Sequence, residues 1–184
     1  MVDEARLEQA GSGLVPVTEG WFVVNVRDAA WETNDAFGSA CFFEGDELPF
    51  AQLGINVRVL APGNSKYLYH AEANQEDFLV VAGECRLLIE GEERELRAWD
   101  FVHCPPGTAH SFVPSGDRPC VIVMTGGRGH GWPEKGLFYP RSDFALRHGV
   151  GVESETDSPA EALASLPEWR RSRPKEWDAL PWAQ

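Results

Sequence analysis

The chain has 184 residues, of which 43% are hydrophobic and 24% are charged, and its formal net charge at pH 7 is −13. A chain of this length can bury roughly 70% of its unfolded surface, so one domain with its own core is expected. Binding to nucleic acid or to anionic lipid depends on attraction between basic side chains and phosphate, so this charge argues against both kinds of partner.

The cysteines and the apolar runs bear on the cellular compartment. Four cysteines are widely spaced, without a C-x-x-C pair: Cys41, Cys85, Cys104 and Cys120. A chain this long needs no disulfide framework, so we expect reduced thiols. The first residues lack the basic and then apolar layout of a signal peptide, and no run approaches the ~20 apolar residues of a membrane span. We therefore expect a cytoplasmic protein.

Residues 1–19 are predicted to be a flexible N-terminal segment. Residues 1–10 could form a short helical turn, but Gly11-Ser12-Gly13 follows, and this composition is typical of flexible chain. We assign no function to this segment.

From residue 20 onward, apolar runs of strand length alternate with turn residues. The turns combine Pro or Gly with polar neighbours, as in Ala61-Pro62-Gly63-Asn64. The runs expected to form strands are 21–26, 54–60, 67–72, 78–81, 85–89, 101–104, 111–113 and 120–124. This rhythm predicts an all-β sandwich or barrel, which we place over residues 20–150.

Residues 125–139 are rich in glycine and then in aromatic residues, and we expect this loop to lie over a barrel mouth. The last part, residues 151–184, is predicted to be a short helix and a Trp-rich tail. Ser158 suits the N-cap, Pro159 the first helical position and Glu161 the third, so a helix should run to about Leu166. The tail should pack on the barrel or on a second subunit.

The segment from His70 to Gly83 carries the strongest chemical signal. His70 and Glu72 lie two residues apart on an expected strand, so they face the same side. Asn74-Gln75 provides a turn, after which Glu76 begins the next strand and could meet His70 and Glu72 across the sheet.

His110 follows the tight turn Pro105-Pro106-Gly107 and opens another short strand. These segments could converge inside a barrel around one divalent ion. The alternative is a metal-free network in which the two histidines hydrogen-bond to Glu72 and Glu76. Two carboxylates brought together without a cation would have to hold a proton, and a bound dication removes that need.

These residues resemble the cupin family, whose motifs have the forms G-x5-H-x-H-x3,4-E-x6-G and G-x5-P-x-G-x2-H-x3-N. The resemblance covers residues 63–114. Glu72 stands where the second histidine is usual, Trp99 replaces the opening glycine of the second motif, and Pro114 replaces its closing asparagine. The resemblance implies a single double-stranded β-helix, a jelly-roll barrel of six to eight strands.

The resemblance also implies that His70, Glu76 and His110 are metal ligands. Glu72 as a fourth ligand is our inference from strand parity, since a carboxylate can replace an imidazole at metals that bind oxygen and nitrogen. A shell without thiolate suits several divalent transition metals, and we rank Zn first, with Mn and Fe next.

Other candidate residues favour structural roles. His103 should point outward, Cys104 should pack inward in the core, and the parity of Tyr67 and Tyr69 is opposite to that of His70. His130 and His148 have no partners at ligand spacing, and we expect both to be solvated.

Two classes of function stay open. The first is a metal-dependent enzyme acting on a small oxygen-bearing metabolite, either an isomerase, cyclase or lyase with Glu72 as the catalytic base, or an iron dioxygenase. The second is a non-catalytic protein that binds or senses a sugar or organic acid. The chain has no helix-turn-helix pattern, which argues against a transcription regulator. The resemblance and the Trp-rich tail lead us to expect a homodimer.

Overall fold

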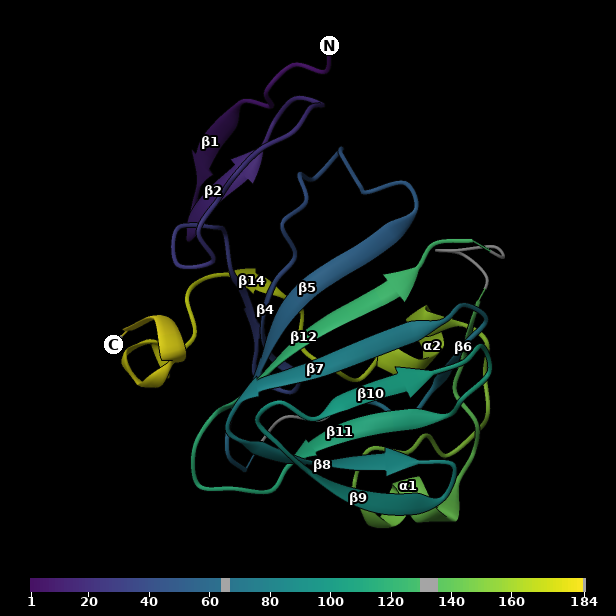
Figure 1. Cartoon of the computed structure of the whole chain (residues 1–184). Coiled ribbons are helices and arrows are strands. Elements are labelled where there is room, and N and C mark those ends of the chain that lie inside the picture. The colour runs from purple at the N-terminus through teal and green to yellow at the C-terminus, as the bar shows by residue number, and fades with distance from the viewer. Residues whose placement is uncertain (64–66, 130–135, 184) are drawn as a thin grey trace.

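The structure is a computed structural model that describes residues 1–63, 67–129 and 136–183. Its regular structure is mostly strand (Figure 1). The strands are β1 (Leu7–Ala10), β2 (Gly13–Pro16), β3 (Glu32–Asn34), β4 (Gly38–Cys41), β5 (Leu53–Leu60), β6 (Ala71–Glu72), β7 (Glu76–Ala82), β8 (Glu84–Ile89), β9 (Glu92–Arg97), β10 (Phe101–Cys104), β11 (His110–Pro114), β12 (Cys120–Gly127), β13 (Leu137–Phe138) and β14 (Arg170–Arg171). The helices are α1 (Asp143–Arg147) and α2 (Pro159–Leu163), and two 3₁₀ turns follow, η1 (Trp177–Ala179) and η2 (Pro181–Ala183).

The strands build a jelly roll, as the motifs predict. The larger antiparallel sheet has the order β10-β7-β12-β5-β4-β3-β14, and the smaller one has the order β11-β8-β9. β6 pairs with β13, and a bridge from His70 to His110 connects the β6 segment to β11. Figure 1 shows β5, β12, β7 and β10 side by side, with β11, β8 and β9 continuing the wall of the barrel.

Strand alternation decides which side chains enter the barrel. In β7, Glu76, Phe78 and Val80 are buried and share one face, as the sequence pattern predicts. The core cluster inside the barrel consists of Leu60, Phe78, Val80, Cys85, Leu87, Val102, Cys104, Phe112, Cys120, Ile122 and Met124. All four cysteines of the chain are free and buried in this structure. Burial of this apolar surface holds the polar inward residues in a rigid frame.

A second cluster covers the outer face of the larger sheet. Val57 and Val59 of β5 pack there with Trp31, which is fully buried. The Trp-rich tail joins this cluster, because Trp177 and Trp182 lie with ring centroids 5.8 and 5.2 Å from that of Trp31. The tail therefore packs on the barrel of its own chain.

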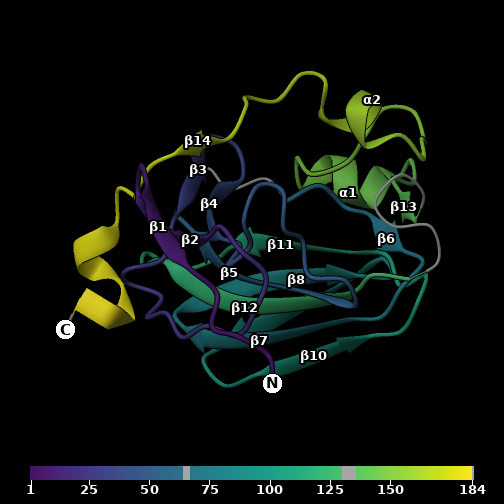
Figure 2. The same ribbon diagram turned by 90° about the horizontal axis from the view of Figure 1, so that it is seen from above.

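The helices gather at one end of the barrel, together with β6 and β13, whereas the two 3₁₀ turns lie at the opposite end (Figure 2). Ser158 caps α2 by accepting a hydrogen bond from the Glu161 N–H, as the sequence predicts. The helix ends at Leu163, earlier than expected. Within the described ranges, no helix is long and apolar enough to cross a membrane.

The turns of the two motifs need left-handed backbone. Gly83 and Gly107 have φ of 74° and 84°. Trp99 stands where the second motif usually opens with glycine, and it keeps the same conformation with φ of 77° while its side chain is 75% exposed. The turn is thus preserved by the surrounding structure, including the hydrogen bond from Trp99 N–H to Val80 O at 2.7 Å.

Several sequence expectations are wrong. Residues 1–10 form no helical turn, because β1 and β2 pair as an antiparallel hairpin. The Ser12 hydroxyl donates a hydrogen bond to Trp31 O and accepts one from Trp31 N–H, and these two bonds tie the hairpin to the barrel. Residues 21–26 were expected to be a strand, but only Trp21 makes an isolated bridge. The pattern also missed β3, β4, β13, β14 and α1. The domain boundaries proposed from the sequence stay predictions.

Candidate metal centre

His70 and His110 lie side by side, one just before β6 and the other at the start of β11. Their main chains form two hydrogen bonds, from His70 N to His110 O at 3.1 Å and from His110 N to His70 O at 2.8 Å. Their ring centroids are 5.0 Å apart. The two imidazoles are thus brought together by one backbone bridge between distant parts of the chain.

Each imidazole is oriented by a hydrogen bond to its own main chain. Nδ1 of His70 lies 2.8 Å from Leu68 O, and Nδ1 of His110 lies 3.0 Å from Thr108 O. A carbonyl oxygen can only accept, so Nδ1 carries the proton in both rings and Nε2 keeps its lone pair. This second hydrogen bond is the usual support of a histidine that ligates a metal.

Glu76, the first residue of β7, completes a three-residue cluster. Its Oε2 lies 3.5 Å from Nε2 of His110. His70, Glu76 and His110 each offer one ligand atom, and these atoms all lie within 4.8 Å of one another. The structure therefore brings together the three residues that the resemblance implies as ligands.

Burial makes this cluster suited to a cation. Burial, aided by the neighbouring His110, lowers the pKa of His70 to about 3, and burial also lowers the pKa of His110. Both imidazoles are therefore neutral, which is the form that binds a metal. Burial and the nearby Glu72 raise the pKa of Glu76 to about 9, so without a cation its carboxyl holds a proton.

One buried atom tests whether the residues fit a metal. Nε2 of His110 is buried and has no hydrogen-bond partner among the described residues. A buried polar atom without a partner costs roughly 1–3 kcal/mol, and a bound ion at the lone pair would remove this cost. Two imidazole nitrogens and a carboxylate fit Zn, Mn or Fe.

Glu72 lies beside the cluster but outside it. Its Oε1 is 3.9 Å from Nε2 of His70. Both acids lie beside Gly126, where a Cβ would make ordinary contacts of 3.6 Å with Cγ of Glu76 and 3.9 Å with Oε2 of Glu72. Burial raises the pKa of Glu72 to about 7. Its role as ligand or base stays a prediction.

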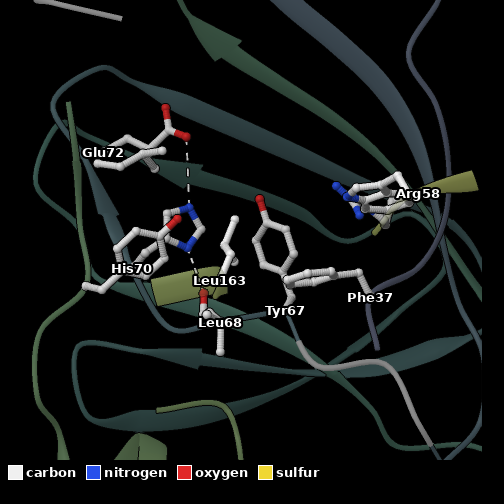
Figure 3. Close-up of a pocket in the computed structure, with 10 residues that line it drawn as sticks. Phe37, Arg58, Tyr67, Leu68, His70, Glu72 and Leu163 are labelled. Carbon is white, nitrogen blue, oxygen red and sulfur yellow. Dashed lines mark hydrogen bonds and ion pairs between the residues drawn. The ribbon is translucent and has the colours of Figure 1, made fainter. Parts of the chain in front are cut away.

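Two cavities reach these residues. One, of about 190 Å³, has His70 and Glu72 on its wall and is otherwise lined by Phe37, Arg58, Tyr67, Leu68, Leu137, Tyr139, Leu163 and Trp169 (Figure 3). The other, of about 250 Å³, has Glu72 and Glu76 on its wall, together with Asn56, Arg58, Tyr67 and Arg128. A small molecule in either cavity would touch a residue of the candidate centre.

The sequence placed some neighbours of the site correctly and others not. Cys104 is buried in the core and His103 is exposed beside Asp77, as predicted. Tyr67, expected to face away from His70, packs against it with ring centroids 5.2 Å apart. Strand parity fails here because residues 67–69 lie outside the strands.

The remaining expectations concern the loops. Leu137 and Tyr139 line the first cavity, so this part of the aromatic stretch lies beside the candidate centre, whereas residues 125–127 belong to β12 and residues 130–135 lie outside the described residues. His130 lies outside the described residues. His148 is not solvated as expected, because its side chain is 20% exposed and lies 3.1 Å from Glu93.

Sequence reasoning missed Phe37, Arg58 and Trp169 at the cavity. Only Arg58 carried a signal, as a charged residue within the apolar run Val57-Arg58-Val59-Leu60.

Comparisons with known proteins support the fold. Residues 56–126 match the family model Cupin_2, described as a cupin domain. This range contains the four residues of the candidate site, which are His70, Glu72, Glu76 and His110. No protein of curated function matches the chain.

Solved structures of similar fold share little sequence with this chain. The polyketide cyclase RemF from Streptomyces resistomycificus has a TM-score of 0.50 at 15% identity, over 58% of this chain and 79% of that one. A putative sugar phosphate isomerase from Acidithiobacillus ferrooxidans has a TM-score of 0.48 at 21% identity, over 74% and 83% of the two chains. The DMSP lyase DddQ from Ruegeria pomeroyi has a TM-score of 0.43 at 22% identity, over 72% and 59%. At 15% identity, the likeness to RemF concerns the fold alone.

Proposed function

Because this chain carries a cupin domain in residues 56–126, we propose that it is a metal-dependent enzyme that moves a proton on a small oxygen-bearing molecule, as an isomerase, cyclase or lyase does. The observation that carries the proposal is the position of Glu72. This carboxylate lines both cavities and stands beside the cluster of His70, Glu76 and His110 without belonging to it.

The three clustered residues would hold the divalent ion. A bound ion would act there as a Lewis acid toward a carbonyl or hydroxyl oxygen of the substrate. Glu76 contributes the negative charge, and the two main-chain hydrogen bonds at Nδ1 keep both imidazoles aimed at the common point.

Glu72 is suited to accept and return the proton. Burial alone raises its pKa toward neutrality, where a general base works best. Its contact with His70 at 3.9 Å is longer than a hydrogen bond, so one oxygen is left for a substrate.

Two tyrosines would orient the substrate. Burial raises the pKa of Tyr139 to about 12 and also raises that of Tyr67, so both hydroxyls stay protonated at neutral pH. Both rings pack on His70, with centroids 5.7 and 5.2 Å away. Their hydroxyls can therefore donate hydrogen bonds to a substrate oxygen while the rings exclude water.

The test is proton exchange with the solvent. Metal-loaded protein is incubated in D2O with a panel of small ketones and 2-oxo acids, and loss of proton signals next to the carbonyl is followed by NMR. We expect exchange with at least one compound, and Glu72→Gln should abolish it while elemental analysis shows the metal retained. Exchange that survives Glu72→Gln, or no exchange with any compound, would contradict the proposal.

An iron dioxygenase is the second candidate, because two histidines and one carboxylate are also the ligand set of non-haem iron oxygenases. Oxygen consumption that requires anaerobic loading with Fe(II) would favour it. Binding of a small molecule without either activity would instead favour the sensor or carrier that the sequence left open.

A further inference from the structure

Arg58 is a buried cation without an acidic partner. It lies on the inward face of β5 and is 6% exposed. Within the described residues, its buried Nε and Nη1 have no hydrogen-bond partner, and no ion pair joins Arg58 to an acid. Both cavities beside the candidate centre include Arg58 in their walls.

The contacts that Arg58 makes with aromatic rings leave Nε and Nη1 without an acceptor among the described residues. Its Cζ lies 5.2 Å from the ring centroid of Tyr67 and 5.1 Å from that of Trp169. Aromatic faces attract a guanidinium, but they do not replace the acceptors that its N–H groups lose on burial. In Figure 3 the nitrogen end of Arg58 points toward the side of the cavity where the Tyr67 hydroxyl lies.

Arg128, on the wall of the second cavity, shows the contrast. Its Nη2 lies 2.8 Å from Oε2 of Glu44, and its Nη1 lies 2.6 Å from Phe50 O. Arg128 therefore has an acidic partner within the chain, whereas Arg58 has none among the described residues. An unpaired buried charge is expensive, so a residue of this kind calls for an anion from outside.

We propose that Arg58 binds the carboxylate of a small organic monocarboxylate, the other end of which reaches His70 and Glu72. This inference rests on the proposed function, because it supplies the substrate class for that same site. The guanidinium fork matches the two oxygens of a carboxylate, so two parallel N–H to oxygen bonds can form.

Charge favours a monoanion over a phosphate ester. A bound divalent ion would offset the negative charges of Glu72 and Glu76, and the single positive charge of Arg58 would then be unmatched. Among the described residues that line the two cavities, Arg58 and Arg128 are the basic ones besides His70, and Arg128 is already paired with Glu44. A phosphate dianion would therefore keep an unpaired charge in a buried place.

The rest of the first cavity fits a flat or apolar body. Phe37 and Trp169 stack with centroids 5.9 Å apart, and Leu68, Leu137 and Leu163 complete the apolar wall. A volume of about 190 Å³ is close to that of a cavity that holds one aromatic ring.

Asn56 offers a second polar contact. It lies on the wall of the second cavity and precedes Arg58 by two residues on the same face of β5, and its buried Oδ1 has no hydrogen-bond partner among the residues that the structure describes. A hydroxyl or amine on the substrate could donate to this oxygen.

Calorimetric titration tests the proposal with acetate, benzoate, benzamide and phenyl phosphate as probes. The wild-type protein should bind benzoate at least 10-fold more tightly than benzamide, the neutral analogue of the same shape. Arg58→Met should weaken benzoate roughly 10- to 100-fold and leave benzamide unchanged. Arg58→Lys should fall between, because it keeps the charge and loses the fork.

Arg86→Met is the matched control, because it removes the same charge from an exposed hairpin, where Arg86 pairs with Glu93 and Glu95. It should bind benzoate like the wild type. Metal content is measured for each protein, and Arg58→Met should keep the metal of the wild type. If the wild type holds no metal, the proposed function fails, yet the comparison of Arg58 variants still decides this inference.

Several results would overturn the inference. One is that Arg58→Met binds benzoate as tightly as the wild type does. Others are that the wild type binds benzamide as tightly as benzoate, or binds phenyl phosphate more tightly than benzoate. The last is that the wild type binds neither acetate nor benzoate. The melting temperature without probe adds a separate readout. Because an unpaired buried charge destabilises the fold, Arg58→Met should melt at the same or a higher temperature. A clear decrease would show instead that Arg58 serves stability.

Discussion

Oε2 of Glu76 lies 3.5 Å from Nε2 of His110, a buried nitrogen that has no hydrogen-bond partner among the described residues. The contact joins the start of β7 to the start of β11. It leaves a neutral imidazole and a buried carboxyl facing each other at a spacing too long for a hydrogen bond, which is the arrangement that a bound cation would complete.

Removing either of these ligands should release the metal. His110→Ala and Glu76→Ala should each lower metal content after dialysis at least 10-fold, as seen by elemental analysis. They should also lower the melting temperature of the metal-loaded protein, because an ion present at 1,000 times its Kd stabilises a fold by about 4 kcal/mol. His103→Ala is the control, since His103 is exposed and pairs with Asp77. Full metal content in His110→Ala would contradict the site.

The metal-free protein should lose stability as the pH rises from about 7 to about 9. Glu76 has a pKa of about 9 in the fold against an ordinary value of 4.5, so the folded state holds a proton that the unfolded state releases. Stability then falls with pH, by at most about 1.4 kcal/mol per unit for one proton. Chemical denaturation of chelator-treated protein across this range measures the slope.

Acid should act on the same protein through the histidines. The pKa of His70 falls from 6.5 to about 3, so its contribution is present above 6.5 and is lost as the pH falls toward 3. Below about pH 7 the effects of Glu76, of Glu72 and of His70 overlap, because the pKa of Glu72 is raised to about 7 and that of His70 is lowered to about 3, so the loss of stability between pH 7 and 9 is the clean test. The substitution Glu76→Gln should remove most of the dependence of stability on pH in this range, and bound metal should suppress this dependence. An equal slope in Glu76→Gln would disprove its assignment to Glu76.

The sequence predicted the inner barrel and the three clustered residues well. Strands β5, β7, β8, β10, β11 and β12 are apolar runs bounded by turn residues, so their pattern and their structure agree. The turns before β7 and β11 then fix where Glu76 and His110 enter the barrel.

The rest depends on packing between distant segments, which no local pattern encodes. β3 contains the polar Glu32 and Asn34, and β4 begins with Gly38 and Ser39, so neither reads as a strand. Trp169 reaches the cavity only because the tail folds back over Phe37. Arg58 was visible as a charge in an apolar run, but its lack of a partner is a property of the fold.

The homodimer expected from the sequence stays a prediction, and the structure narrows the surface that could form it. Trp177 and Trp182 pack against the barrel of their own chain. Trp99 lies just before the edge strand β10 and is 75% exposed, and Phe101 lies in β10 and is 64% exposed. Light scattering should give twice 20.4 kDa, and Phe101→Ser should shift the mass toward a monomer. A mass of 20.4 kDa for the wild type at high concentration would reject the dimer.

Alanine substitutions at two turn glycines of the barrel distinguish the cost of a left-handed backbone from the cost of a steric clash. Gly83 and Gly91 have φ of 74° and 80°, so alanine at either position costs about 1–2 kcal/mol in conformational energy. A Cβ at Gly83 would also lie 2.3 Å from Pro119 O, whereas at Gly91 it would meet nothing within 4 Å. Gly83→Ala should therefore be less stable than Gly91→Ala by roughly 1–3 kcal/mol. Because each kcal/mol shifts melting by about 2–4 °C in a chain of this size, thermal denaturation resolves the difference. Equal melting temperatures would mean that the turn at Gly83 relaxes away from Pro119.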